Sequence, residues 1–171
     1  SYEILLPPTE FDPLEVVPAV PPSLRADPSG QLFIVQFVTQ PLEEFRQEIR
    51  RVGGTVYGFL PNNADVVKMN EMTRGEVEAL PYVRWVGPYH PGYRLEAFLG
   101  ENLDQAGALF PLQAYNIAVF ESGPGQKNLV AQRIAQIGGT IGVVPTDGFL
   151  LYATLTPEQQ QLVDRVSRNI Y

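Results

Sequence analysis

The sequence predicts an α+β protein built from two tandem copies of one unit, preceded by a proline-rich arm. The first observation is that residues 49–56 recur as residues 134–141, with apolar residues at the same steps, then Gly-Gly-Thr and a β-branched residue. This pattern is typical of a helix end, a turn and a strand start, so two copies indicate an internal duplication. The second observation is that each copy lies in the order strand, helix, strand, strand, helix, strand. That order is the ferredoxin-like βαββαβ plan with an antiparallel sheet.

The arm is predicted at residues 1–30, where prolines at seven positions disfavour a helix or a central strand. Its apolar residues are too many for a solvated linker. We expect the arm either to lie on the surface of the first unit or to contact a partner. The apolar residues in question are Ile4, Leu5, Leu6, Phe11, Leu14, Val16, Val17 and Leu24.

The first unit is predicted at residues 31–95, and its first strand, at about 32–38, is apolar on both alternating sets of side chains. A strand of this kind is normally covered on both faces. Helices cover only one face of a split βαβ sheet, so something else must cover the other. This surplus of apolar surface is the main physical basis of the functional hypothesis.

The rest of the first unit follows from helix and turn signals. Pro41 is predicted in the first turn of a helix that ends at Gly53 or Gly54. Thr73 with Glu76 is interpreted as a capping box that starts a second helix. Trp85 is assigned equally to the core and to a partner contact. The remaining strands are predicted at about 55–60, 64–69 and 83–87.

The second unit is predicted at residues 112–171, after a linker at 96–111. Its first strand carries Tyr115, Ile117 and Val119 on one side. Thr156 is predicted to cap the last helix, with Pro157 at its first position. The predicted fourth strand reaches the last residue given, so we expect a fragment or a cleavage product.

Composition and motifs argue against several classes of function. A net charge of −7 disfavours a nucleic-acid-binding face, and no apolar run approaches the length of a membrane span. The chain has no cysteine and one histidine, His90, so we predict no thiol chemistry and no metal site. Gly123-Pro124-Gly125 lacks the third glycine of a dinucleotide loop and is interpreted as an ordinary turn. We therefore predict neither enzymatic activity nor a cofactor.

Residues 80–91 carry the most specific likeness to known proteins. The run Leu80-Pro81-Tyr82-Val83-Arg84-Trp85-Val86-Gly87-Pro88-Tyr89-His90-Pro91 follows Phe33-Ile34-Val35-Gln36-Phe37, Gly53-Gly54-Thr55-Val56 and Pro61-Asn62-Asn63-Ala64. In this order, these residues resemble the N-terminal proregions of bacterial subtilisin-like serine proteases. The arm motif Phe11-Asp12-Pro13-Leu14 and the second unit resemble the long proregions of some of these enzymes. No catalytic Asp, His or Ser motif of the protease is present.

The resemblance implies a non-catalytic propeptide of a zymogen, or a stand-alone inhibitor, that assists folding of the protease domain and blocks its cleft. In that family the open sheet face packs on the protease, and the C-terminal tail lies in the substrate cleft by strand addition. We favour docking by the second unit, because it lies nearer the end where a protease domain would follow. The expected sheet-face residues are Tyr115, Ile117 and Val119, and the expected tail residues are Arg168, Asn169, Ile170 and Tyr171.

The resemblance also implies a secreted or exported bacterial protein, with a complex already formed in the cytoplasm as a second option. The only partner expected is the protease domain. Two alternatives stay open. One is a regulatory module in which two units share a small-molecule or protein-binding site, and the other is a scaffold whose units pack face to face.

Overall fold

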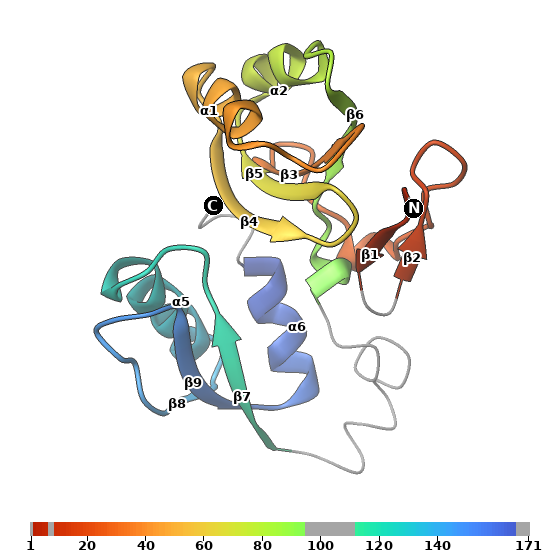
Figure 1. Ribbon diagram of the computed structural model, residues 1–171. Coiled ribbons are helices and arrows are strands. Elements are labelled where there is room, and N and C mark those ends of the chain that lie inside the picture. The colour runs from red at the N-terminus through yellow and green to blue at the C-terminus, as the bar shows by residue number, and fades with distance from the viewer. Residues whose placement is uncertain (1, 7–8, 95–111, 167–171) are drawn as a thin grey trace. The chain divides into compact units, whose positions relative to one another are not determined.

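The computed structural model describes residues 2–6, 9–94 and 112–166, which form an α+β protein with antiparallel sheets. The chain divides into two compact units, residues 1–94 and 95–170. The first unit contains the predicted arm and the first repeat, and the second contains the other repeat (Figure 1). The predicted linker at 96–111 and the residues after 166 lie outside the described part of the chain.

The sheet of the first unit has four strands in the order β4-β5-β3-β6, and every neighbouring pair is antiparallel. Along the chain, these strands and two helices follow the predicted order, and both helices lie on the same side of the sheet (Figure 1). The elements are β3 (Leu32–Phe37), α1 (Glu43–Arg51), β4 (Thr55–Leu60), β5 (Ala64–Lys68), α2 (Glu71–Glu78), β6 (Val83–Pro88) and the short 3-10 helix η2 (Pro91–Arg94).

The core of the first unit lies between this sheet and its helices. Phe33, Val35 and Phe37 of β3 pack there with Ile49 of α1 and Val77 of α2. Successive side chains of a strand point to opposite faces. All six residues of β3 are nevertheless buried, so the face away from the helices is covered as well.

Both helices of the first unit begin at other residues than predicted. Helix α1 begins at Glu43 with Leu42 at the N-cap, so Pro41 precedes the helix. The predicted capping box at Thr73 is wrong, because Asn70 is the N-cap of α2 and its side chain accepts the Thr73 N–H at 2.8 Å. The Thr73 hydroxyl instead donates to the carbonyl of Val52 at the end of α1, at 3.1 Å.

The arm forms two short strands and a 3-10 helix before the first repeat. Strands β1 (Ile4–Leu6) and β2 (Thr9–Phe11) pair antiparallel, with Ile4 opposite Phe11. The 3-10 helix η1 (Pro22–Leu24) follows after a segment without regular structure. The arm thus contains more regular structure than its proline content indicates.

The second unit has a three-stranded antiparallel sheet in the order β7-β9-β8. Two helices accompany it, and their inward side chains form a core with the sheet. The buried members of this core include Val130, Ile134, Leu151, Leu155 and Val163. As predicted, Thr156 caps the last helix, because its hydroxyl accepts the Gln159 N–H at 3.2 Å. The elements are β7 (Gln113–Ala118), α5 (Pro124–Gln136), β8 (Thr140–Ile141), β9 (Leu150–Leu155) and α6 (Pro157–Val166).

The repeated octet makes the same joint in both units. Gly53 and Gly138 have positive φ angles of 103° and 84°, which favour glycine after a helix. The next residues, Gly54 and Gly139, each donate an N–H at 2.9 Å to the carbonyl of the isoleucine five residues earlier. The structure therefore agrees with the interpretation of the octet as a helix end, a turn and a strand start.

Candidate functional site

The face of the first sheet that points away from the helices is covered by the arm. This arm-side face includes Leu32, Ile34 and Gln36 of β3 and Ala64 and Val66 of β5, and all five are buried. Of the two alternatives that the sequence left open for the arm, the structure has the arm on its own unit.

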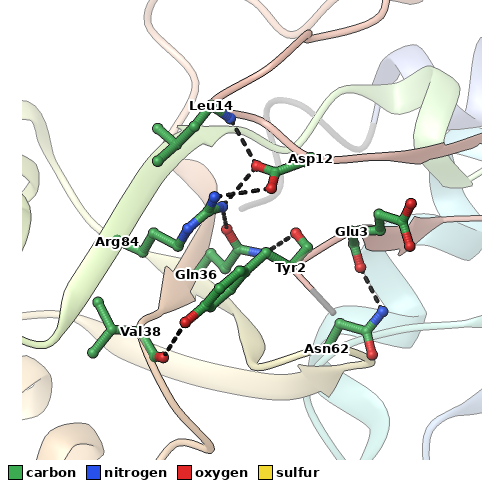
Figure 2. Close-up of polar contacts among 8 residues, drawn as sticks. All are labelled: Tyr2, Glu3, Asp12, Leu14, Gln36, Val38, Asn62 and Arg84. Carbon is green, nitrogen blue, oxygen red and sulfur yellow. Dashed lines mark hydrogen bonds and ion pairs between the residues drawn. The ribbon is translucent and has the colours of Figure 1, made fainter.

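Hydrogen bonds join the β1–β2 hairpin and the residues beside it to the sheet, as Figure 2 shows. Arg84 donates through its two terminal nitrogens to the two carboxylate oxygens of Asp12, at 2.8 and 2.9 Å. Gln36 donates its amide to the Tyr2 carbonyl at 2.6 Å, and Tyr2 donates its hydroxyl to the Val38 carbonyl at 3.1 Å. The buried amide of Gln36 is therefore satisfied by the arm, as a buried polar group requires.

Arg84 is the centre of this contact. Its guanidinium also donates to the Gln36 side-chain oxygen at 2.7 Å, and it lies 4.3 Å from the centre of the Tyr2 ring. The hydrogen bonds from Arg84 hold the pKa of Asp12 below its ordinary value, although burial opposes them. Pairing with Arg84 thus favours the charged form of the Asp12 carboxylate.

Aromatic side chains complete the cover. The Phe11 ring meets the Trp85 ring edge-on, with centroids 6.4 Å apart, and it also contacts Tyr93. The Trp85 ring lies across Gly87, where an added Cβ would come within 2.0 Å of it. Trp85 therefore packs between the sheet and the arm of its own unit, which corresponds to the first of its two predicted roles.

His90 holds the later part of the arm. Its Nδ1 accepts the Ala26 N–H at 2.9 Å, and its ring lies against Tyr93. Burial, with a smaller effect from the positive charge of Arg25, lowers the pKa of His90. Because its Nδ1 accepts a main-chain N–H, the imidazole of His90 has a structural role in holding the arm.

The sheet of the second unit has a different distribution of burial. Tyr115, Ile117 and Val119, the predicted protease-binding face, pack instead toward the helices in the core of this unit. The prediction placed the wrong alternating set outward. The opposite set, here called the open face, includes Ala114, Asn116, Ala118, Leu150 and Tyr152, which are all exposed, and Thr154, which is partly buried.

Strand β8, at one edge of the second sheet, is followed by a loop at residues 142–149 that a side chain of α5 holds in place. Lys127 of α5 is fully buried, and its Nζ donates to the carbonyls of Pro145 and Asp147 at 2.6 and 2.5 Å. The loop presents Val143 and Phe149, which are 62% and 52% exposed. These side chains extend the apolar surface beside the open face.

The predicted turn at Gly123-Pro124-Gly125 is a helix start. Pro124 is the first residue of α5, and Gly123 has a positive φ of 96°. The Gln126 side-chain oxygen accepts the N–H groups of Phe120 and Glu121 at 2.8 and 3.0 Å. The segment is therefore a turn that leads directly into α5.

Over the described ranges, no group of three or more histidine and carboxylate side chains is placed to hold a metal ion. No helix in this part of the chain is both long and apolar enough to span a bilayer. The tail residues Arg168, Asn169, Ile170 and Tyr171 lie outside the described residues.

Comparison with known proteins gives one match. Residues 6–90 match the model of a family described as a domain of unknown function (DUF8729). The matched range contains strand β2 of the arm and all four strands of the first sheet. No curated protein and no solved structure matches the chain.

Proposed function

We propose that this chain is a non-catalytic propeptide or inhibitor of a subtilisin-like serine protease, which it also helps to fold. The resemblance of residues 80–91 and of the surrounding order of motifs suggests the family. The observation that carries the docking mode is the difference between the two sheets. The first sheet is covered by its own arm, whereas the open face of the second is exposed.

As part of this proposal, both units are ferredoxin-like. The first unit supports this assignment with its element order and the sheet order β4-β5-β3-β6. In the second unit, the described residues supply the first three strands, and the fourth is proposed to lie after α6.

The protease is proposed to dock on the open face, with Leu150 and Tyr152 as its apolar anchors. These side chains are 41% and 39% exposed, and Phe149 beside them is 52% exposed. Aromatic and aliphatic anchors of this kind dominate binding energy at interfaces. Arg168 to Tyr171 remain the proposed residues that enter the substrate cleft by strand addition. Secretion or export from a bacterium remains the proposed location, with a cytoplasmic complex with the protease before export as the second option.

Inhibition of a subtilisin-like protease by the purified chain tests the proposal. We expect slow or tight inhibition by the parent chain, and a loss of affinity of at least about 2 kcal/mol for Leu150→Asp combined with Tyr152→Asp. Met72→Asp is the matched control, because Met72 is 78% exposed on α2 of the first unit.

Two outcomes contradict the proposal in different ways. Full protease activity in the presence of excess parent chain removes the inhibitor function itself. Equal inhibition by the double variant and by Met72→Asp keeps the function and removes the open face as the docking surface. A rise in melting temperature with a small metabolite, and none with the protease, would favour the regulatory-module alternative.

A further inference from the structure

The segment that connects the β1–β2 hairpin to η1 is the most exposed apolar stretch of the first unit. In this connecting segment, residues 14–19, Leu14, Val16 and Val17 are 62%, 63% and 45% exposed. The residues on either side, Pro13 and Val20, are buried. Exposed loop segments whose ends are fixed are common sites of binding and of proteolytic cutting.

Both ends of the connecting segment are anchored. At the start, the Asp12 carboxylate accepts the Leu14 N–H, and the Asp12 carbonyl accepts the Glu15 and Val16 N–H groups, all at 3.0 Å. At the end, Arg25 donates its Nε to the Val20 carbonyl at 2.7 Å. The side chains of Val20 and Leu24 also pack against Gly92.

The backbone between these anchors is open to a partner. Residues 16–20 have no regular secondary structure, and within the described residues Val17 and Ala19 donate no main-chain hydrogen bond. An endopeptidase binds its substrate as an added extended strand and needs such unpaired groups. Strands β1 and β2, by contrast, use their backbone groups to pair with each other.

We propose that the connecting segment is a site of proteolytic nicking, and that the hairpin stays bound to the first unit after the cut. Val16, Val17 and Ala19 of the segment are small and apolar, which suits an endopeptidase with a small apolar specificity pocket. The bonds after Val16 and Ala19 qualify, whereas the bonds after Val17 and Val20 precede prolines. In the hydrolysis, water supplies a hydroxyl to the carbonyl carbon and a proton to the departing amine as the C–N bond breaks.

After a cut in the connecting segment, contacts made by the hairpin itself would still hold it on the first unit. Arg84 holds Asp12, and Asn62 donates its amide to the Glu3 carbonyl at 2.6 Å. Phe11 packs on Trp85. Each of these contacts joins a residue on the N-terminal side of the cut to a residue of the first repeat, so the cut removes none of them.

The cut would allow the arm-side face to become exposed. A tethered hairpin is present at the high effective concentration that its linker imposes, whereas a nicked hairpin is an independent ligand that dissociates on dilution. Nicking therefore converts a permanently covered apolar face, with Ile34 and Val66, into one that can be uncovered. This inference does not depend on the identity of the protease in the proposed function.

Limited digestion with elastase tests the inference, because its specificity pocket is small and it is not a subtilisin-like enzyme. We expect the first cut within residues 2–94 to fall between Leu14 and Val20, as located by mass spectrometry of the denatured digest. The same sample under native conditions should retain both pieces, with a total mass increased by one water. A first cut elsewhere in residues 2–94, or immediate loss of the hairpin, would overturn the proposal.

Two variants make the result specific. Val16→Asp combined with Ala19→Asp places carboxylates where the small pocket needs apolar groups, and we expect loss of cutting in the segment without a change in melting temperature. Continued cutting at the same bonds would contradict the assignment.

Asp12→Asn keeps the side-chain oxygen that accepts the Leu14 N–H but removes the charge paired with Arg84. Once nicked, this variant should lose the hairpin at dilutions where the nicked parent keeps it, and equal retention would contradict docking through this pair.

Discussion

The two units share one helix–strand joint but differ in what surrounds it. In each, a glycine with positive φ follows the helix, and the next glycine packs against an isoleucine of that helix. In the first unit, the face away from the helices is covered by the arm, and a tight turn at Pro61-Asn62-Asn63 joins β4 to β5. In the second, that face is exposed, and a longer loop held by Lys127 joins β8 to β9.

The comparison separates two levels of the fold. Residues within the repeat determine the helix-side core, which is apolar in both units. Segments outside the repeat determine the opposite face. One sequence pattern can therefore support a unit whose outer sheet face is covered by its own chain and a unit whose outer sheet face is exposed.

A further difference inside the repeats is a buried ion pair. In the first unit, Arg46 of α1 holds Asp65 of β5 with two hydrogen bonds of 2.7 and 3.0 Å, and Asp65 is fully buried. By the spacing of the octet, the position of Arg46 corresponds to Ala131. Asp65 lies opposite Val35, and the corresponding pair in the second unit is Leu151 opposite Ile117.

We expect Arg46→Ala to lower the free energy of unfolding by about 3 kcal/mol, because it leaves a buried carboxylate without its partner. Arg46→Ala combined with Asp65→Leu, the pattern of the second unit, should fall within about 1 kcal/mol of the parent. Urea unfolding followed by Trp85 fluorescence reports on the first unit, since the chain has one tryptophan. Arg50→Ala, which breaks the exposed pair with Glu43, is the control and should cost less than about 1 kcal/mol. Equal costs for Arg46→Ala and Arg50→Ala would contradict the reading of the pair as buried.

Lys127→Met should destabilise the second unit by about 2 kcal/mol, because two main-chain carbonyls lose a charged donor. Among its described residues, the first unit has no equivalent of this contact, so its stability should be unaffected. Hydrogen exchange of amides in β9 and in β3 measures the two units separately. Lys68→Met, on the partly buried Lys68 of β5, is the control, and a comparable loss there would show that the effect is not specific to the loop.

Gly54→Ala and Gly139→Ala should each cost about 1–3 kcal/mol through overpacking. An added Cβ would lie 2.6 Å from Cγ2 of Ile49 in the first case and 2.7 Å from Cγ2 of Ile134 in the second. Gly75→Ala, in an exposed part of α2 with nothing within 4 Å, should instead stabilise by about 0.5–1 kcal/mol. Thermal unfolding of the three variants measures these changes. A tolerated alanine at one joint alone would show that the two joints are not equivalent.

The smallest expected effect is the pH dependence of the arm at His90. Its pKa is lowered in the folded chain, so the unfolded chain binds more protons between the folded value and the ordinary value of about 6.5. Stability is therefore fully present above about pH 6.5 and falls as the pH drops through that window. Amide exchange at Ala26 between pH 7 and pH 5 should show this loss. His90→Asn, which keeps an acceptor but does not titrate, should remove the dependence.

The sequence predicted the α+β class, the repeat and the element order of the first unit, because apolar periodicity and the Gly-Gly-Thr octet are local signals. It also indicated that the arm-side face needs cover, since β3 is apolar on both sets. The arm contacts could not be predicted, because Arg84, Gln36 and Asp12 are far apart in the chain. A signal was nevertheless present in Gln36, a polar residue inside an apolar strand, which needs a partner when buried.

The misplaced residues have identifiable physical causes. Tyr115, Ile117 and Val119 were predicted outward, but Ala114, Asn116 and Ala118 form the smaller and more polar set, and the more apolar set packs toward the helices. Thr73 fits a capping-box spacing, but Asn70 lies one turn earlier and is an equally good cap. In both cases the local pattern was present in the sequence. Nearby residues offered a second way to satisfy it, and the structure uses that second way.

The buried carboxylate of Asp65 also bears on how a chain with two similar halves avoids crossed assembly. Tandem repeats are prone to exchange equivalent strands while they fold. If β5 entered the other sheet, Asp65 would lie against Ala131 without a guanidinium to neutralise it. We expect this mismatch to discourage the exchange, so Arg46→Ala combined with Asp65→Leu should refold in lower yield even where its final stability equals that of the parent.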